Sequence, residues 1–429
     1  MEVALELAPA LLAVGFILGY RQSAVVVAGA VVSALALTPI IAWIGAGLPA
    51  PLYPERALRV AEMSAGQIWK QYIRYIGAGA VATAGVLTVV RNLPMMGGAF
   101  MAVLRGMRRG ALDGAAAPPD TDRDLPGRFI LAAIVAVIAA VALVPGLIAG
   151  EMGLAARLVC AIGVAVFGLL FVAVAARIVG IVGVSSQPTS GITLVTLLGT
   201  ASVFAAFGWD DLGARAAVLT VGTIVAVAAS KAGDISQDLK TGFLVGATPA
   251  RQQLGQLIGA ACACWAVAGT VLLLSSYGFG TKELAAPQAT LMKTIIEGVL
   301  SGELPWGLVL TGGGLAGSAM LCGVSGLAFA IGVYLPLASM LPIFLGGCAR
   351  ALADRGAAQT GEARPGILAA SGVVAGEGLA GVLVAGLVAA GAVPKSAEPW
   401  IGGDAGRLAT LLLVVAICWF LVRAGRSRA

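Results

Sequence analysis

Residues 324–349 read VSGLAFAIGVYLPLASMLPIFLGGCA and contain no charged side chain. An uncharged apolar stretch suits the interior of a lipid bilayer, yet glycines and prolines interrupt this one at short intervals. Backbone that leaves the helix at membrane depth survives only where it is buried in protein or lines a water-filled cavity. We therefore predict a broken or re-entrant membrane segment over 324–349.

The composition of the whole chain also indicates a membrane protein. Of its 429 residues, 59% are hydrophobic and 11% are charged, and the mean hydropathy is +0.98. Soluble domains carry about 25% charged residues. The apolar runs are long and unbroken, without the alternation of a β-barrel. We therefore predict an all-α polytopic integral membrane protein, a single transmembrane domain over 1–429 with about 10–12 membrane segments.

Apolar runs of spanning length mark the expected helices. They fall at 24–46, 67–90, 129–149, 154–183, 192–209, 212–230, 252–274, 305–322, 367–390 and 406–422. Two further apolar stretches are short or interrupted, namely 7–19 and 324–349.

The basic residues predict the orientation of the chain. By the positive-inside rule, the loop 105–128, the polar segment 231–251, the connection 350–364 and the C-terminal tail are cytoplasmic. The connection 275–303 is assigned to the outside, because acidic residues balance its lysines. Two apolar runs already cross the membrane between 231–251 and 350–364. The segment 324–349 should therefore enter and leave by the same face.

A second stretch near the N-terminus resembles the opening one. The letters AVGFIL at 13–18 match AIGVYL at 330–335, and the same shift lays VAGA at 27–30 over FLGG at 344–347. Secondary transporters are often built from repeats whose short, Gly- or Pro-interrupted segments form the binding site. We therefore predict an internal repeat, in which the stretch 7–19 is half of a broken helix.

Two of the charged residues within the apolar runs are candidates for function. Glu377 lies near the middle of 367–390, between two glycines. An ionisable residue inside a span is expensive and is a functional hypothesis by default. Glu377 could carry a proton, contact a cationic group, or form an ion pair that only fixes packing. Arg177, near the end of 154–183, either snorkels to the interface or binds a carboxylate.

An uncharged polar segment, VSSQPTSG at 184–191, separates two apolar runs. It could expose unwound carbonyls and the N-terminus of the following helix to a substrate, or it is an ordinary loop. Its candidate substrate-binding residues are Ser185, Ser186, Gln187, Thr189 and Ser190.

The densest polar cluster beside a span is KAGDISQDLKTG at 231–242. Asp234 and Asp238 share a helix face at i, i+4, and Lys240 lies two residues on. Paired carboxylates can share a proton, which would suit proton coupling. The alternative is a solvated cytoplasmic loop.

The residue inventory excludes several functions. Histidine is absent, which removes His-ligated metals, His proton relays and Ser-His-Asp catalysis. We expect no enzyme and no cofactor beyond a proton gradient. The net charge of +6 lies mostly in connections and the tail, so it indicates membrane orientation rather than nucleic-acid binding.

Several motifs, in order along nearly the whole chain, resemble the oligopeptide transporter family, in its bacterial branch related to yellow stripe-like metal-chelate transporters. The segment 184–191 is similar to that family's Ser-Ser-Asn-Pro-Ile-Ser-Gly motif, with Gln187 in place of Asn. The cluster from Lys231, continued to Pro249, resembles a family signature. Further matching motifs are Ile68–Gly77, Leu304–Trp306, Gly332–Pro336 and Ala375–Leu379.

The resemblance implies a proton-coupled symporter of small oligopeptides or metal-chelate complexes in the bacterial cytoplasmic membrane. It implies an internal repeat and broken helices around a central site, to which we assign Tyr334 from the Gly332–Pro336 motif. A metal would enter only as cargo, with the chelator supplying the ligands. The expected partners are membrane lipid and the small substrate, and a homo-oligomer is left open.

In one respect the chain departs from the resemblance. Family members usually have several further spans before the stretch that begins here near Leu7. The sequence therefore leaves a second interpretation, a truncated non-transporting membrane subunit that requires a partner. An intramembrane enzyme or a channel has no supporting motif.

Overall fold

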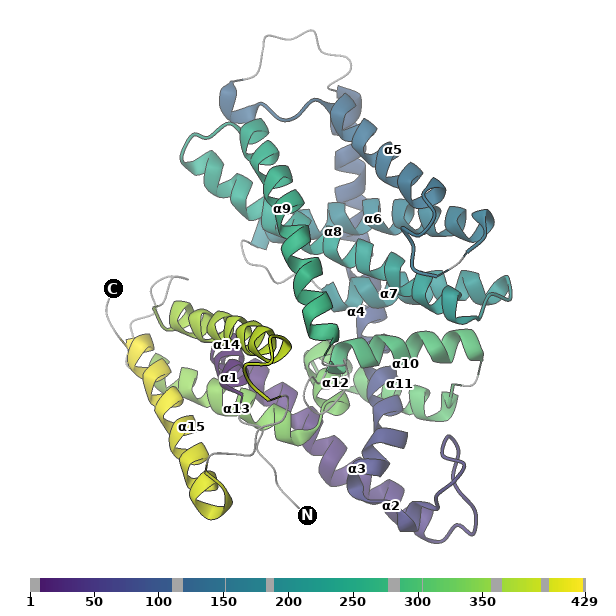
Figure 1. The fold of residues 1–429 in the computed structure, drawn as a ribbon, viewed down its shortest axis with the longest axis vertical. Coiled ribbons are helices and arrows are strands. Elements are labelled where there is room, and N and C mark those ends of the chain that lie inside the picture. Colours follow the sequence, from purple (N-terminus) through teal and green to yellow (C-terminus); the bar gives the residue numbers. More distant parts are fainter. Residues whose placement is uncertain are drawn as a thin grey trace. The chain divides into compact units, whose positions relative to one another are not determined.

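The computed structural model describes residues 8–109, 119–150, 152–182, 189–276, 286–302, 304–355, 365–394 and 401–426. Over these residues the chain is helical, without any β-strand (Figure 1). Nine described helices are long and apolar enough to cross a membrane, and Gly191–Ala206 and Trp306–Leu321 are shorter apolar helices. The predicted all-α polytopic fold is confirmed.

The helices fall close to the predicted runs. The first part of the chain forms α1 (Pro9–Val31), η1 (Val32–Leu37), α2 (Thr38–Ala46), η2 (Val60–Glu62), α3 (Ala65–Ile68), η3 (Trp69–Ile73), α4 (Arg74–Arg109), η4 (Asp120–Asp122), α5 (Gly127–Leu143) and α6 (Leu154–Val182). The rest forms α7 (Thr189–Ala206), α8 (Leu212–Leu244), α9 (Pro249–Ser275), α10 (Pro287–Ser301), α11 (Trp306–Leu321), α12 (Gly326–Tyr334), α13 (Leu337–Asp354), α14 (Pro365–Ala389) and α15 (Gly403–Arg426).

The chain divides into two compact units. The first unit comprises Met1–Ala84, Gly269–Pro287 and Pro305–Ala429, and the second comprises Gly85–Ala268 and Gln288–Leu304. The sequence alone suggested one domain. We describe each unit separately.

The second unit is a helical bundle around α8. Helices α6 and α7 pack along α8, and α5 packs along α6 (Figure 1). The core gathers apolar side chains from these helices and from α10, including Leu197, Phe204 and Ile296. Asp211 begins α8 by accepting a hydrogen bond from the Ala214 N–H at 2.7 Å, which satisfies one of the free donors at the helix start.

The first unit is organised around a broken helix. At Gly19, α1 leaves the helical conformation, with φ 79° and ψ 168°, a region that only glycine occupies readily. In the same unit α12 ends at Tyr334, and α13 begins at Leu337 after the extended pair Leu335–Pro336. The stretch 324–349 is therefore a helix, a break and a second helix, and 7–19 contains one half of another broken helix, as predicted.

The two broken helices pack on each other through matching glycines. A Cβ added at Gly15 would collide with the Ile343 carbonyl of α13, and a Cβ added at Gly332 would collide with the Val26 carbonyl of α1. The same difference in residue number separates Gly15 from Gly332 and Val26 from Ile343. Exchanging equivalent residues of the two copies therefore turns the first contact into the second.

A second pair of contacts obeys the same shift. Gly29 lies against the Phe329 carbonyl, and Gly346 lies against the Leu12 carbonyl. In all four contacts the residue number rises in one helix as it falls in the other, so the partners run antiparallel. A two-fold rotation that exchanges antiparallel membrane helices has its axis in the membrane plane, which is the geometry of an inverted-topology repeat. The predicted internal repeat is thus present in the packing.

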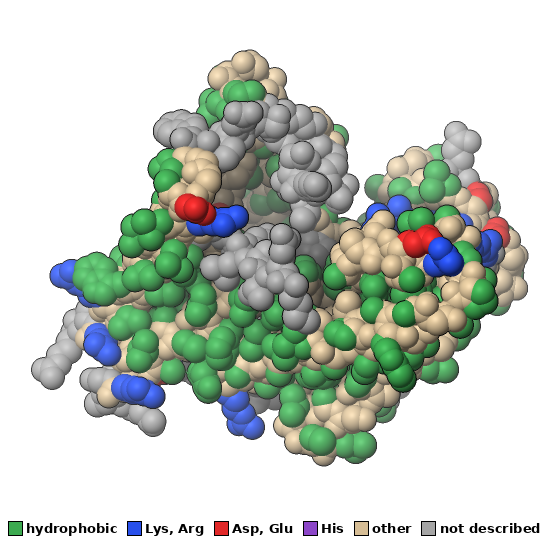
Figure 2. Space-filling view, turned by 90° about the horizontal axis from the view of Figure 1, so that it is seen from below, with side chains coloured by type: hydrophobic (Ala, Val, Ile, Leu, Met, Phe, Trp, Pro, Cys, Tyr) green, Lys and Arg blue, Asp and Glu red, His purple; other side chains and the backbone are tan. Residues whose placement is uncertain are grey.

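Large apolar side chains remain exposed on the membrane-length helices. Trp265 on α9 is 80% exposed and Leu321 at the end of α11 is 90% exposed. In the face drawn in Figure 2, hydrophobic side chains cover much of the surface and charged ones are few. A stable soluble protein does not expose so much apolar surface to water, so this surface faces lipid.

Three parts of the predicted connections are helical. Helix α10 lies inside the predicted outer connection 275–303, α4 continues to Arg109, and α8 extends through the polar segment to Leu244. Helix α10 packs its apolar side chains Met292, Ile296 and Leu300 against the core of the second unit.

Candidate functional site

The first half of α1, residues 9–18, is held at its N-terminal end by Glu377 of α14. The Ala10 N–H donates a hydrogen bond to Glu377 Oε2 at 2.5 Å. The N-cap position is Ala8, whose side chain cannot accept a hydrogen bond. Glu377 therefore supplies from another helix the negative charge that the positive end of a helix favours.

The other end of the same half-helix meets a cation. Arg350 of α13 donates from Nη1 to the Phe16 carbonyl at 3.5 Å, and its guanidinium lies 5.4 Å from the centre of the Phe16 ring. Arg350 also forms an ion pair with Asp354 at 3.1 Å. A cation near the last carbonyls of a helix complements their partial negative charge. A carboxylate and a guanidinium thus clamp this half-helix from both ends.

A cavity of about 620 Å³ opens beside the break in α1. Its lining includes Tyr20 and Arg21, which follow the break, and Ser318 and Cys322 of α11. Within the described part of the chain, Arg21 makes no ion pair. Arg21 lies between the apolar stretches 7–19 and 24–46 and was not predicted as a site residue. Its position inside one broken helix becomes visible only when α1 joins these stretches.

A second cavity, of about 530 Å³, opens beside the break between α12 and α13. Pro336 and Leu337 line it on one side. On the other sides lie Ser33 in η1 and Trp69 in η3, and both of these segments are π-helical. Such π-helical turns occur frequently at functional sites. The indole N–H of Trp69, a residue of the cavity wall, is buried without a hydrogen-bond partner.

Tyr334, the last residue of α12, lies buried beside this second break. Its side chain hydrogen-bonds with that of Arg74, the first residue of α4. One turn later, the backbone of Gly77 packs directly on Tyr334. The structure therefore places the predicted residue Tyr334 at the break itself and pairs it with the cation Arg74.

The residues Asp234, Asp238 and Lys240 lie in the second unit, near the C-terminal end of α8. Asp234 pairs with Lys231 at 3.7 Å, whereas Asp238 accepts a hydrogen bond from Gln256 of α9. Each carboxylate thus has its own partner. That the two share a proton, or that Lys240 takes part, stays a prediction.

A cavity of about 570 Å³ lies between the ends of α8 and α9 in the second unit. Lys231, Asp238 and Gln256 line it, and Gln252 donates to the Asp238 carbonyl at 3.2 Å. These polar contacts join the two helices of the hairpin. The predicted polar cluster is therefore helical and lines an open groove.

The remaining predicted residues are also in the second unit. Arg177 is exposed on α6, Thr189 begins α7 and its carbonyl accepts a hydrogen bond from the Thr193 hydroxyl at 2.8 Å, and Ser190 is the second residue of α7. Ser185, Ser186 and Gln187 lie outside the described residues.

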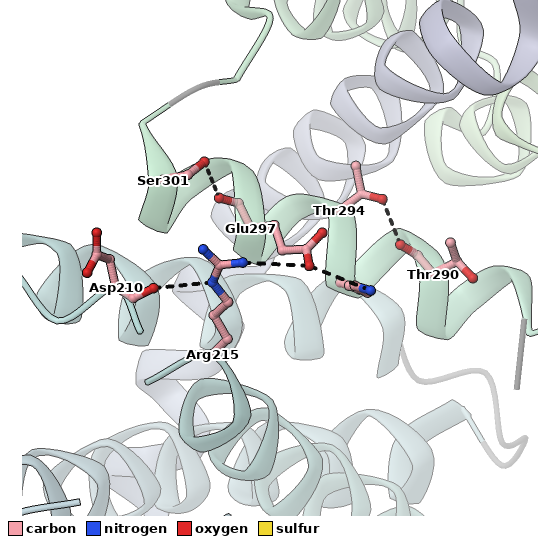
Figure 3. Close-up of polar contacts among 7 residues, drawn as sticks. Asp210, Arg215, Thr290, Thr294, Glu297 and Ser301 are labelled. Atoms are coloured by element: carbon pink, nitrogen blue, oxygen red, sulfur yellow. Dashed lines mark hydrogen bonds and ion pairs between the residues drawn. The ribbon is translucent and has the colours of Figure 1, made fainter. Parts of the chain in front are cut away.

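An ionic cluster that no local sequence pattern predicts ties α10 to α8 (Figure 3). Arg215 of α8 approaches Glu297 of α10 at 3.8 Å and donates to the Asp210 carbonyl at 3.2 Å. Lys293 approaches Glu297 at 3.7 Å. The side chains are between 34% and 66% exposed, so screening makes each ion pair weak. The cluster orients α10 rather than forming a reactive centre.

Metal coordination by the protein finds no support among the residues with described positions. No group of three or more Cys, Asp or Glu side chains there could hold an ion.

Comparison with known proteins identifies a family. The family model of the OPT oligopeptide transporter protein matches residues 1–388. A Haemophilus influenzae protein is 29% identical over 321 residues, which cover 66% of this chain and 50% of the relative. A Saccharomyces cerevisiae protein is 38% identical over 91 residues, 21% of this chain and 11% of the relative. The curated names of both give oligopeptide transport as a provisional assignment. The chain spans about half the length of the Haemophilus relative.

Proposed function

This chain belongs to the OPT oligopeptide transporter family, and from that premise we propose that it is a secondary active transporter. In this proposal it carries small oligopeptides or metal-chelate complexes across the bacterial cytoplasmic membrane together with protons. The observation that carries the proposal is the pair of broken helices, which cross as an inverted repeat beside two cavities. Transporter sites typically lie at such repeat interfaces, between discontinuous helices.

Alternating access requires an element with two arrangements that a ligand can bias. The half-helix 9–18 is a suitable element, because the helical backbone conformation is interrupted at Gly19 and side chains of other helices hold its ends. Glu377 holds one end and Arg350 holds the other. Breaking either contact would release that end without unfolding the helix.

Glu377 is our proposed coupling residue. As a carboxylate it accepts a charge-assisted hydrogen bond from the Ala10 N–H, and such bonds are roughly twice as strong as neutral ones. Protonation removes the charge and weakens the hold on the first turn of α1. Proton binding would thereby loosen the half-helix that borders the break, and proton release would fix it again.

The two cargo classes come from the family resemblance, and the described residues are compatible with both. Peptides and chelates both present carboxylates, amides or amines, which arginine, tyrosine and tryptophan side chains can bind. A chelate brings its own metal ligands, so a chain without histidine remains compatible with metal transport. The choice between the two classes is left to experiment.

The test is uptake by the purified 429-residue chain in proteoliposomes. A labelled mixture of tri- and tetrapeptides is offered with and without an inward proton gradient, and iron(III) citrate is offered in parallel. We expect accumulation of one class only when the gradient is present. In Glu377→Gln, exchange of cargo should persist while the gradient no longer drives accumulation.

Asp404→Asn provides the matched control, because Asp404 is 96% exposed at the start of α15, and it should transport as the wild type does. Uptake that ignores both the gradient and Glu377→Gln would refute proton coupling. Absence of uptake and exchange for both classes would refute transport by this chain and favour a membrane subunit that needs a partner.

A further inference from the structure

Arg21 lies at the centre of the inverted repeat. The four glycine contacts pair Leu12 with Gly346 and Gly15 with Ile343 on one side, and Val26 with Gly332 and Gly29 with Phe329 on the other. When this antiparallel register is continued from the four contacts toward the two breaks, Tyr20 lies opposite Ala338 and Arg21 lies opposite Leu337. Beside the break, the Tyr20 ring also contacts the ring of Phe344 in α13, with centroids 6.0 Å apart.

The central position fixes the depth of Arg21 in the membrane. The axis of an inverted repeat lies in the membrane plane, and the sites of such repeats lie near the bilayer midplane. Residues at the level of the axis share that depth. An arginine there is expensive, and membrane proteins place one at mid-depth only toward the protein interior or a water-filled cavity, where it binds an anion.

The surroundings of Arg21 provide the cavity without the anion. Arg21 lines the 620 Å³ cavity together with Tyr20, Ser318 and Cys322, and no Asp or Glu is among the lining residues. Within the described part of the chain no carboxylate reaches the guanidinium. Glu377 of α14, the carboxylate that contacts the first half of α1, is engaged with the Ala10 N–H. The anion must therefore come from outside this set of residues.

We propose that Arg21 binds the carboxylate of the transported cargo, either the C-terminus of a peptide or a carboxylate of a chelator. The inference rests on the proposed transport function and assigns its anchoring residue. Arginine suits this role because its planar guanidinium binds a carboxylate through two parallel hydrogen bonds.

The two copies of the repeat make this anchor unique. The position equivalent to Arg21 in the second copy is Ala338, which lines the other cavity. Of the two equivalent positions only Arg21 carries a positive charge, so the site has one position for a carboxylate. A peptide would therefore bind in a single direction. Its C-terminus would lie at the α1 break, and the remainder would extend away from it.

The test measures binding to the purified chain through the shift in melting temperature. The probes are a mixture of tetrapeptides with free C-termini, the same mixture with amidated C-termini, and iron(III) citrate. Wild type and Arg21→Gln are compared for each probe. Arg407→Gln is the matched control, because Arg407 is 84% exposed and lies outside the repeat contacts.

We expect the wild type and Arg407→Gln to bind free-acid peptides, or iron(III) citrate, at least about tenfold more tightly than Arg21→Gln does, because a hydrogen bond to a charged group is lost. Preference for free over amidated peptides identifies the peptide carboxylate, and binding of iron(III) citrate alone identifies a chelator carboxylate. The ligand-free melting temperatures show that each variant is folded. Should Arg21→Gln fail to fold, Arg21→Lys, which keeps the charge but not the paired donors, serves for the same comparison.

Equal binding by wild type and Arg21→Gln, or equal wild-type binding of free and amidated peptides without citrate binding, would overturn the proposal while leaving transport intact. Failure of the wild type to bind any of the three probes would overturn the proposed function and this inference together.

Discussion

The two breaks of the repeat share a geometry and differ in chemistry. In α1 the helix stops at Gly19, and Tyr20 and Arg21 follow. In the second copy the helix stops before Pro336, and Leu337 and Ala338 follow. Matching glycine contacts hold the four half-helices in symmetric positions. The glycine contacts, which both copies share, set the packing of the helices. The residues that follow each break differ between the copies, so they can give the two breaks different functions.

The neighbours of the two breaks differ in the same way. The first break borders a half-helix with a charged clamp at each end, Glu377 and Arg350. The second break borders a mainly apolar cavity with π-helical walls and the indole of Trp69. The difference therefore lies in the charged clamp on the first half-helix, because both cavities have mainly apolar walls.

The largest effect is expected from the shared glycines. Gly15→Val and Gly332→Val should each lower the free energy of unfolding by about 1–3 kcal/mol, because the new side chain must push a helix backbone aside. Melting temperatures in detergent would measure this, with Gly314→Val as the control, because a Cβ at Gly314 meets no atom within 4 Å. Similar losses at both sites would support the two-fold symmetry, and a loss at only one would break it.

A smaller loss is expected at the clamp on the first half-helix. Glu377→Ala removes the acceptor of the Ala10 N–H and should lower the free energy of unfolding by about 0.5–2 kcal/mol, as other N-cap losses do. Ser371→Ala on the same helix is the control, because its hydroxyl bonds only to the Ile367 carbonyl one turn earlier. A Glu377→Ala protein as stable as the control would show that the carboxylate does not hold α1.

The opposite end of that half-helix should matter less. Arg350→Gln loses a 3.5 Å contact to the Phe16 carbonyl and a favourable charge at the helix end, worth about 0.3–1 kcal/mol. The loss should shrink as salt is added to the melting experiment, because ions screen such interactions. A salt-independent loss would instead point to the packing of Arg350 on the Phe16 ring.

At the second break, two neighbouring aromatic residues should respond differently. Tyr72→Phe loses the 2.7 Å bond from its hydroxyl to the Leu52 carbonyl and should cost about 1 kcal/mol. Trp69→Phe loses no hydrogen bond, because its indole N–H has none, and should change stability by less than about 0.5 kcal/mol. Weakened cargo binding in the stable Trp69→Phe variant would show that cargo contacts this wall of the cavity.

The smallest effect is a pH dependence in the loop before the second cavity. The Ala57 N–H, followed by that of Arg56 and the Gln71 amide, lowers the pKa of Glu55 below its ordinary value of 4.5. Because the pKa of Glu55 is lower in the folded than in the unfolded protein, Glu55 stabilises the fold at pH values above its ordinary pKa of 4.5. This contribution to stability is lost as the pH falls through the lowered pKa of the folded protein. Wild type should melt slightly above Glu55→Gln at pH 7, and the difference should vanish in acid.

Much of the fold was predictable because hydropathy reports directly on lipid contact. The apolar runs fell on helices, and the glycines and prolines of 324–349 marked a real break. Helix α10 escaped prediction because its short amphipathic sequence carries Lys293 and Glu297, which lower the average hydropathy of the connection. Only packing against the second unit's core makes it a stable element.

The site was less predictable because its contacts join residues far apart in sequence. The partner of Glu377 is a backbone N–H 367 residues away, which no local pattern encodes. Arg21 was hidden because the polar letters around it split one broken helix into two apparent stretches. Asp234 and Asp238 were correctly placed on a helix, yet their individual partners, Lys231 and Gln256, depend on how α8 meets α9.

The most direct test of this account maps where cargo binds. A tetrapeptide with a photoreactive diazirine on its C-terminal residue would be irradiated with the purified chain, and the labelled residues would be identified by mass spectrometry. The account predicts labelling around the cavity at the α1 break, on Tyr20, Ala24 or Ser318, and loss of that labelling in Arg21→Gln. Labelling confined to the groove between α8 and α9, near Asp238 and Gln256, would contradict it.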